Sequence, residues 1–314
     1  MIIFNYICMC LIFGTTFLAI KIGVDEGLPP FFSAGIRFFM AGILLFLMMS
    51  LRKKATLAVL FSKESFITGS TLTFGTFATL YWAEQYVASG VGAVLSATGP
   101  IMILLIQTIV LHVKLSIRTF VGCAISLIGV ALLLMPNLTV SYDSIWLIAC
   151  FLILLGQVGY AAGTIYSKKV SERFSGTSPI MLNAAQMIYG GALLLLLSLT
   201  SEQIKIGVLA NKNAIGSIVY LTVFGSMIAH TIYYWLVSKT DPIFPSTWLY
   251  ISPIIALGLG KVLYQEKITW LMFFGGITII AGLIVINSKA LITHFANKCR
   301  TDSVKSESYR ANKA

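Results

Sequence analysis

The chain has 314 residues, of which 58% are hydrophobic and 11% are charged, and its mean hydropathy is +0.91. Soluble domains carry about 25% charged residues, so this composition excludes an ordinary soluble enzyme, and the high hydrophobicity excludes a disordered chain. A protein that crosses the membrane several times remains. Because one bilayer-spanning helix takes about 20 apolar residues, a chain of 314 residues has room for roughly ten spans and for no large aqueous domain.

Ten apolar runs follow one another along the chain, each bounded by charged residues or by glycine and proline clusters. Their continuous apolar character excludes the alternating pattern of a membrane β-barrel, so each run predicts a helix. The expected fold is therefore all-α and integral to the membrane. The ten predicted helices cover residues 2–24, 32–51, 65–87, 91–113, 116–135, 145–168, 179–199, 213–237, 243–264 and 268–288.

The basic residues are distributed unevenly between the two sides of this predicted bundle. If the N-terminus lies in the cytoplasm, sixteen lysines and arginines fall on the cytoplasmic side and four on the other side. The positive-inside rule then predicts a multi-pass protein of the cytoplasmic membrane with both termini inside. The net charge of +11 belongs to loops and to a basic tail, residues 289–314, which we expect to be disordered and to bind no nucleic acid.

The two halves of the chain resemble each other, as in many transporters. Each half holds five predicted helices, the first repeat covering residues 1–136 and the second residues 143–288. An odd number of spans makes the second repeat enter the membrane from the opposite side, so the repeats are expected to be inverted. A shift of 153 residues superimposes Tyr81-Trp82 on Tyr234-Trp235, Pro100 on Pro253, Gly122 on Gly275 and Gly129 on Gly282.

Several motifs also resemble a known family. They are Phe13 to Lys21, the run Ala34 to Phe38, Gly99-Pro100, and Tyr264 to Thr269. In this order, with ten helices and an internal repeat, they are similar to the EamA-type drug/metabolite transporters over about residues 5–288. The resemblance implies a fold of two inverted five-helix repeats and export of small metabolites, often amino acids. The sequence departs from the pattern at Phe13, where a tryptophan is usual, and at Val113, the counterpart of Glu266.

The candidate substrate-binding residues begin with equivalent faces of the third and eighth predicted helices. Tyr81 and Gln85 on one, and His230 and Tyr234 on the other, follow at four-residue spacing that lines one side of a helix. Gln157 is a buried amide that needs a partner, and Tyr160 lies three residues further on. Trp248 and Tyr250 have apolar counterparts in the first half, which points to an aromatic or planar substrate, with ordinary packed or lipid-facing rings as the alternative.

Ionisable side chains within spans are costly and are therefore candidates for function. Arg37 is the candidate for binding a substrate carboxylate, with snorkelling to the membrane surface as the alternative. His230 titrates near neutrality and Glu84 is an acid near the end of a span, so both are candidates for proton coupling. A hydrogen-bonded structural histidine and a solvated or paired glutamate are the alternatives.

Two prolines and several glycines are expected to shape the helices. Pro100 and Pro253 fall inside the fourth and ninth predicted helices, where each would remove a backbone hydrogen bond and kink the helix at a gate or merely for packing. Small residues at helical spacing permit close helix approach. These are Gly159 with Gly163, Gly122 with Gly129, and Gly275 with Gly282.

The sequence thus predicts a secondary-active transporter, not an enzyme, with neither cofactor nor metal. A phosphate loop fails at Gly260-Lys261, and no HExxH motif or intramembrane pair of acids is present. The expected partners are the lipid bilayer and a small-molecule substrate, most simply an exported amino acid or a related amphiphilic or aromatic compound. An efflux carrier for organic cations and a channel are the alternatives, and homo-oligomerisation stays open.

Overall fold

The structure is a computed structural model that describes residues 1–87, 89–114, 116–137, 143–203, 208, 211–264, 269–286 and 288. Every regular element within these residues is helical, and they contain no strand. The expectation of an all-α protein is therefore confirmed for the described part of the chain. The predicted tail, residues 289–314, and Glu266 lie outside the described residues.

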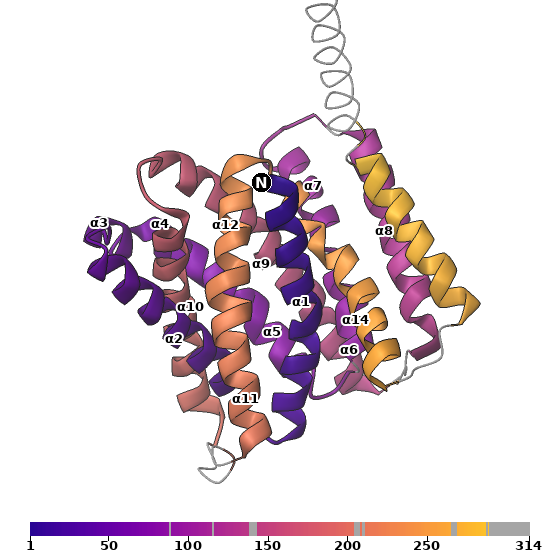
Figure 1. The fold of residues 1–314 in the computed structure, drawn as a ribbon, viewed down its shortest axis with the longest axis horizontal. Helices are drawn as coiled ribbons and strands as arrows, with labels where there is room; N and C mark the ends of the chain where they lie inside the picture. Colours follow the sequence, from indigo (N-terminus) through magenta and orange to yellow (C-terminus); the bar gives the residue numbers. More distant parts are fainter. Residues whose placement is uncertain are drawn as a thin grey trace, which may run out of the picture.

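The helices of the first half run from the N-terminus to residue 137 and are drawn in indigo to magenta (Figure 1). They are α1 (Ile2–Asp25), α2 (Pro30–Leu51), α3 (Leu57–Leu60), α4 (Lys63–Thr68), η1 (Gly69–Gly75), α5 (Thr76–Ala83), α6 (Ser89–Ser96), α7 (Gly99–Ile109), α8 (Ile117–Leu134) and η2 (Met135–Asn137).

The helices of the second half follow in the same bundle and are drawn from rose to yellow. They are α9 (Ser144–Arg173), α10 (Pro179–Ser201), α11 (Lys212–Tyr220), η4 (Leu221–Ala229), α12 (His230–Lys239), α13 (Ile243–Ser246), α14 (Trp248–Tyr264) and a last helix, Trp270–Ile286.

Seven helices in the described residues are long and apolar enough to cross a membrane. Two shorter apolar helices, Ile243–Ile255 and Trp270–Ile286, fall in the ninth and tenth predicted segments. The third predicted segment is filled by α4, η1 and α5, which begin with the charged pair Lys63-Glu64. Helices thus occupy all ten predicted segments, while the count of ten spans stays a prediction.

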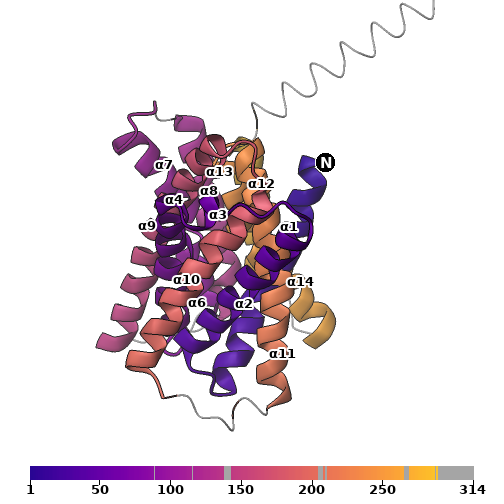
Figure 2. The same ribbon diagram turned by 90° about the vertical axis from the view of Figure 1, so that its left-hand side faces the viewer.

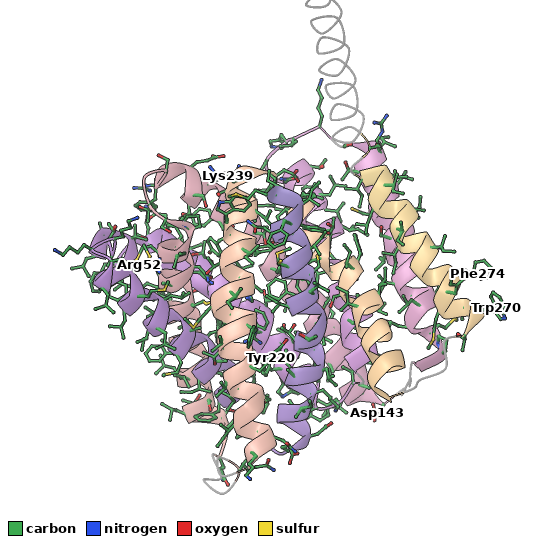
Figure 3. The ribbon with its side chains drawn as sticks, viewed as in Figure 1. Arg52, Asp143, Tyr220, Lys239, Trp270 and Phe274 are labelled. Carbon is green, nitrogen blue, oxygen red and sulfur yellow. The ribbon has the colours of Figure 1, made fainter. Side chains whose placement is uncertain are left out.

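The outside of the bundle is apolar. Trp270 is 78% exposed, Leu199 is 72% exposed and Phe151 is 64% exposed. Trp270 and Phe274 project away from the bundle in Figure 3. Large exposed apolar surface of this extent is typical of a protein that faces lipid.

Helix boundaries follow from local hydrogen bonding at the ends of the apolar runs. The Asp143 carboxylate accepts a hydrogen bond from the Trp146 amide at 3.1 Å and caps α9. The first turn of α2 is capped from a distance, because the carboxylate of Glu202 accepts hydrogen bonds from the amides of Phe31 and Phe32 at 2.7 and 2.8 Å. The end of α10 is thereby fixed to the start of α2, and the two helices lie side by side (Figure 2).

Two wide-turn π-helical segments, η1 and η4, interrupt the third and eighth predicted helices. The sequence did not predict them. A shift of 153 residues carries η1 onto residues 222–228, inside η4, so the interruption recurs at the same place in both halves. Segments of π-helix are rare and are frequent at functional sites.

Pro100 does not lie inside a continuous helix as expected. The helix breaks after Ser96, and Pro100 is the second residue of α7. An amide in the first turn of a helix has no intrahelical acceptor, so a proline at this position costs no hydrogen bond. Pro253 does lie inside a helix, α14, as predicted.

Glycines bring two pairs of helices into backbone contact. On α8, a Cβ added at Gly129 would lie 2.6 Å from the amide nitrogen of Ile279, and one added at Gly275 would lie 2.5 Å from that of Leu133. In the second pair, a Cβ at Gly42 of α2 would lie 2.8 Å from the amide nitrogen of Ile188 on α10. Close packing at the glycines of α8 and of the last helix is therefore confirmed.

Gly275→Ala is expected to destabilise the protein by about 1–3 kcal/mol, because the backbone of α8 cannot move aside for the new methyl group. The adjacent glycine provides a matched control, since a Cβ at Gly276 meets nothing within 4 Å. Thermal unfolding of the two purified variants in detergent measures the difference. Equal melting temperatures for Gly275→Ala and Gly276→Ala would contradict the close backbone contact between α8 and the last helix.

Candidate functional site

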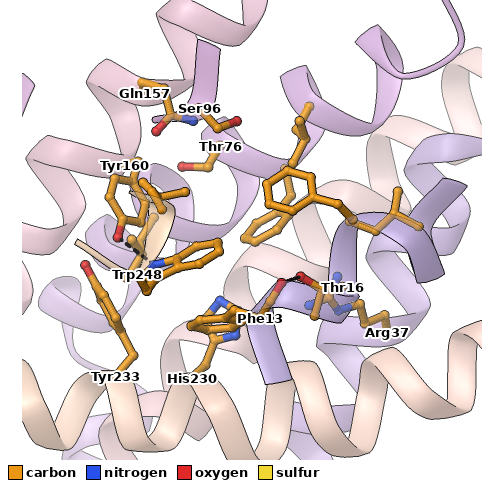
Figure 4. A pocket seen from close by; sticks show the side chains of 16 residues that line it. Phe13, Thr16, Arg37, Thr76, Ser96, Gln157, Tyr160, His230, Tyr233 and Trp248 are labelled. Atoms are coloured by element: carbon orange, nitrogen blue, oxygen red, sulfur yellow. Dashed lines mark hydrogen bonds between the residues drawn. The ribbon is translucent and has the colours of Figure 1, made fainter. Parts of the chain in front are cut away.

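A cavity lies in the middle of the bundle, where helices of both halves meet (Figure 4). Its lining is mostly apolar and aromatic with a few polar groups, as in small-molecule sites. From the first half it is lined by Phe13, Thr16, Phe17, Ile20, Arg37, Leu72, Thr76, Phe77, Leu80 and Ser96, and from the second by Gln157, Tyr160, His230, Tyr233, Trp248 and Leu249.

The cavity is narrow. The cavity volume, taken as the space open to the centre of a water-sized sphere, is about 40 Å³. One buried water needs about 10–15 Å³ measured in this way, so there is room for about three waters. A molecule larger than a few waters therefore does not fit the cavity in this conformation.

Arg37 is the one charged side chain in this lining. It lies on α2 with 1% of its surface exposed. Its Nε donates to the hydroxyl of Ser226 at 2.8 Å, and its Nη1 donates to the hydroxyl of Tyr81 at 2.9 Å. The guanidinium carbon lies 4.5 Å from the ring centre of Phe38 and 5.4 Å from that of Phe77, so aromatic faces also stabilise the charge.

No carboxylate within the described residues forms an ion pair with Arg37. The charge is held only by neutral hydroxyls and rings, although a buried charge is ordinarily paired. Gly225 makes room for it, because a Cβ at that position would lie 2.8 Å from Nη2 of Arg37. The guanidinium is thus a buried cation that can still accept an anionic partner.

His230 lies beside this cation and is packed among aromatic rings. Its Nδ1 lies 2.7 Å from the carbonyl oxygen of Gly225, one turn earlier in the same helix. The ring centre of Phe13 is 4.9 Å away with its plane at 84°, and that of Phe38 is 5.7 Å away at 85°. His230 therefore forms part of the aromatic wall and ties it to the π-helical segment η4.

The side of the cavity around Trp248 and Tyr160 combines aromatic rings with hydroxyl groups, and Phe13 connects it to His230. The indole Nε1 of Trp248 donates to the hydroxyl of Tyr160 at 3.3 Å, and the ring of Phe13 lies 4.3 Å from that of Trp248 (Figure 4). Near Tyr160, Oε1 of Gln157 and the hydroxyl of Ser96 have no hydrogen-bond partner within the described residues. Buried polar atoms without partners are rare, so these two atoms are available to a ligand or to water.

Five of the nine predicted substrate-binding residues line the cavity: Arg37, Gln157, Tyr160, His230 and Trp248. Tyr81 lies directly behind the lining and holds Arg37.

The three other predicted residues lie elsewhere. Gln85 is exposed beyond the end of α5, and its amide donates to the carbonyl oxygen of Trp82. Tyr234 is buried in an apolar cluster around α12, and Tyr250 is buried against Cys123 and Ile279. None of the three touches this cavity.

Gln85 misses the cavity because α5 ends at Ala83, before the predicted face reaches it, and Tyr234 misses it because of helix geometry. A step of four residues in a helix of 3.6 residues per turn drifts by about 40°, so the face rotates away from the cavity. Tyr233, three residues after His230, lines the cavity in place of Tyr234. Its hydroxyl lies 2.8 Å from that of Thr164, which anchors α12 to α9.

One face of α1 also lines the cavity and was not among the predicted site residues; it contributes Phe13, Thr16, Phe17 and Ile20. Their spacing of three, four and seven residues is the signature of one helix face, here with aromatic and hydroxyl side chains mixed in. That pattern could have identified them. Nothing in the sequence pointed to Ser226 as a partner of Arg37, because the two are 189 residues apart.

A helical bundle with several membrane-spanning helices, an apolar outer surface and a central cavity defines a multi-pass membrane protein. The EamA-like transporter family model matches residues 1–135 and again residues 147–288. The chain belongs to this family.

Similar proteins support the same class. The uncharacterized inner membrane transporter YedA of Escherichia coli K12 is 32% identical over 289 residues, which cover 90% of this chain and 89% of that protein. The uncharacterized transporter YoaV of Bacillus subtilis is 24% identical over 90% of this chain and 96% of its own length. A crystal structure of a protein 17% identical superposes with a TM-score of 0.73 over 91% of this chain and 97% of the other, which shows a shared fold.

Gly225→Ala is expected to lower the melting temperature of the protein, since the methyl group must displace Nη2 of Arg37 and strain its hydrogen bonds to Ser226 and Tyr81. Overpacking of this kind costs about 1–3 kcal/mol. Gly216→Ala, earlier in the same run of helix, serves as the control, because a Cβ at Gly216 meets nothing within 4 Å. Equal melting temperatures for the two variants would show that the guanidinium of Arg37 does not lie against Gly225.

Proposed function

We propose that the protein is a secondary-active transporter that moves small carboxylate-containing metabolites across the cytoplasmic membrane by alternating access. Amino acids with apolar or aromatic side chains are the substrate class that the cavity favours. Export is the direction implied by the family resemblance. The two matched halves are proposed to form inverted five-helix repeats, with both termini in the cytoplasm and the cavity between the repeats.

The observation that carries this proposal is the buried Arg37 without an acidic partner. An uncompensated charge in a low-dielectric interior costs several kcal/mol, so it persists where function requires it. A guanidinium matches a carboxylate in geometry and can bind it through two parallel hydrogen bonds. A substrate carboxylate would therefore complete the charge balance of the site.

The rest of the lining supports an amphiphilic substrate. Arg37 and Thr16 lie on one side of the cavity, and Trp248 and Tyr160 lie on the other (Figure 4). With its carboxylate on Arg37, a substrate would lay its side chain against the rings of Trp248 and Phe13. Aromatic faces give large apolar contact area, which suits an apolar or aromatic side chain.

Alternating access is supported by features that recur in both halves. The π-helical segments η1 and η4 occupy equivalent positions, and η1 supplies Leu72 to the lining while η4 holds Arg37 through Ser226. The glycine seams between α2 and α10, and between α8 and the last helix, join equivalent helices of the two halves at short distance. Rocking of one half against the other about such seams would open the narrow cavity to each side in turn.

Counterflow in liposomes tests the proposal. Purified protein is reconstituted with unlabelled L-phenylalanine, L-leucine or L-cysteine inside, and entry of the same labelled compound is followed, with an organic cation as a further compound. Saturable exchange of the amino acids supports the proposal. Exchange of the cation alone would support the multidrug alternative, and a conductance without saturable exchange would support a channel.

Arg37→Gln is expected to reduce amino acid counterflow by about 10-fold or more, because a hydrogen bond to a charged group contributes about 1.5–3 kcal/mol. Arg52→Gln is the matched control, since Arg52 is an exposed arginine at the end of the same helix. Normal counterflow in Arg37→Gln would show that the substrate carboxylate binds elsewhere.

A further inference from the structure

Glu84 is a buried acid that is not among the residues lining the cavity. It follows the last residue of α5 and has 0% of its surface exposed. Both of its carboxylate oxygens are buried, and neither has a hydrogen-bond partner within the described residues. Ala83, the residue before it, and Val87, three residues after it, belong to an apolar cluster that includes Ile153 of α9.

The position of Glu84 is at one end of the cavity. Leu80 lines the cavity, and Glu84 lies one helical turn beyond it on α5. On α6, Ser96 lines the cavity, and Gly92 lies one turn away in the opposite chain direction. A Cβ at Gly92 would lie 3.8 Å from Oε1 of Glu84 and 3.8 Å from Leu80, so α5 and α6 enclose the acid between them.

The charged and titratable groups around Glu84 come from three neighbouring helices. On α1, Lys21 and Asp25 act on it electrostatically, but they form an ion pair with each other at 2.9 Å and are 32% and 59% exposed. On α2, Arg37 donates a hydrogen bond to the hydroxyl of Tyr81, which in turn interacts electrostatically with Glu84. On α9, the thiol of Cys150 packs against the surrounding apolar cluster. Glu84 therefore lies within electrostatic reach of the partly exposed pair on α1.

The environment fits a neutral carboxylic acid and does not fit a carboxylate. An ionised carboxylate in apolar surroundings, with no donor on either oxygen, is strongly unfavourable, whereas the protonated acid carries no net charge. The second half has no equivalent acid, because the shift of 153 residues places Val237 on this position. The acid is thus a property of one half only.

His230 is less suited to carry a proton. Its Nδ1 is engaged by the carbonyl oxygen of Gly225, and its ring is enclosed by Phe13 and Phe38. A protonated imidazole would also place a second positive charge close to Arg37, which acts on it electrostatically.

We propose that Glu84 is the proton-binding residue of this transporter and couples proton movement to transport. In the conformation described here, the carboxyl group is protonated and closes one end of the cavity. When α1, α5 and α6 separate at this end, water reaches Glu84, its O–H bond breaks, the proton passes to water, and the electron pair stays on the hydrated carboxylate. Closure requires the reverse step, in which the carboxylate takes up a proton from water.

This inference rests on the proposed carrier function, and two readouts in the same liposomes distinguish failure of one from failure of the other. Labelled L-phenylalanine counterflow reports the carrier, and a pH-sensitive dye inside the liposomes reports protons that move when L-phenylalanine is added outside. The expected result for the wild type is a proton signal together with counterflow. Counterflow without a proton signal overturns the inference and leaves the carrier function standing.

Glu84→Gln is expected to lower the proton signal per transported L-phenylalanine to the level of liposomes without protein, because the amide cannot release a proton. Glu84→Asp, which keeps a carboxyl group, is expected to restore part of the signal. Glu172→Gln is the control, since Glu172 has 66% of its side chain exposed. A wild-type ratio in Glu84→Gln would overturn the assignment.

Infrared spectroscopy of the purified protein at neutral pH tests the assignment without any transport. A C=O stretching band of a protonated carboxyl group in apolar surroundings is expected in the wild type and in Glu172→Gln, and is expected to be lost in Glu84→Gln. Monodisperse elution of each variant in detergent establishes folding. Absence of the band from the wild type would overturn the proposal even if no substrate had been found.

Discussion

The structure depends on holding one positive charge in the interior of an apolar bundle. The guanidinium of Arg37 has no acidic partner within the described residues, so its surroundings must stabilise it by other means. Tyr81 and Ser226 accept its hydrogen bonds, and the rings of Phe38 and Phe77 face it. These groups come from α2, α5 and η4, so the charge ties both halves of the chain together. The cost of burying a charge therefore becomes a constraint on how the helices can move, since any motion that separates Ser226 from Arg37 must supply a replacement partner.

The helices could be predicted from the sequence because a bilayer demands long apolar runs, and such runs are visible in any one sequence. Breaks within them were not predictable in the same way. In a π-helical turn such as η1, hydrogen bonds join residues five apart instead of four apart, and no residue type in that segment requires this pattern. The break before Pro100 is similar, since a proline fits either a kink or the first turn of a new helix.

Residues of the candidate site could be predicted where their side chains are of a type that is rare in membrane spans. Arg37, Gln157 and His230 stand out because polar groups are rare in spans, and all three line the cavity. Aromatic residues are common in spans, so rings such as Tyr250 could not be separated from packing rings by type alone. Whether Glu84 lacked a partner could not be read from the sequence either, because pairing depends on residues distant in the chain that the fold brings together or keeps apart.

The pairing of α8 with the last helix bears on how the chain is made. The flat glycine face of α8 is synthesised in the first half of the chain, while the helix that covers it, Trp270–Ile286, is synthesised after all the other described helices. Until the last helix is made, the small residues of this face therefore lack the partner against which they pack in the complete fold. Completion of the fold is thus tied to completion of the chain, and a chain truncated before residue 270 would leave the glycine face of α8 without the helix that covers it.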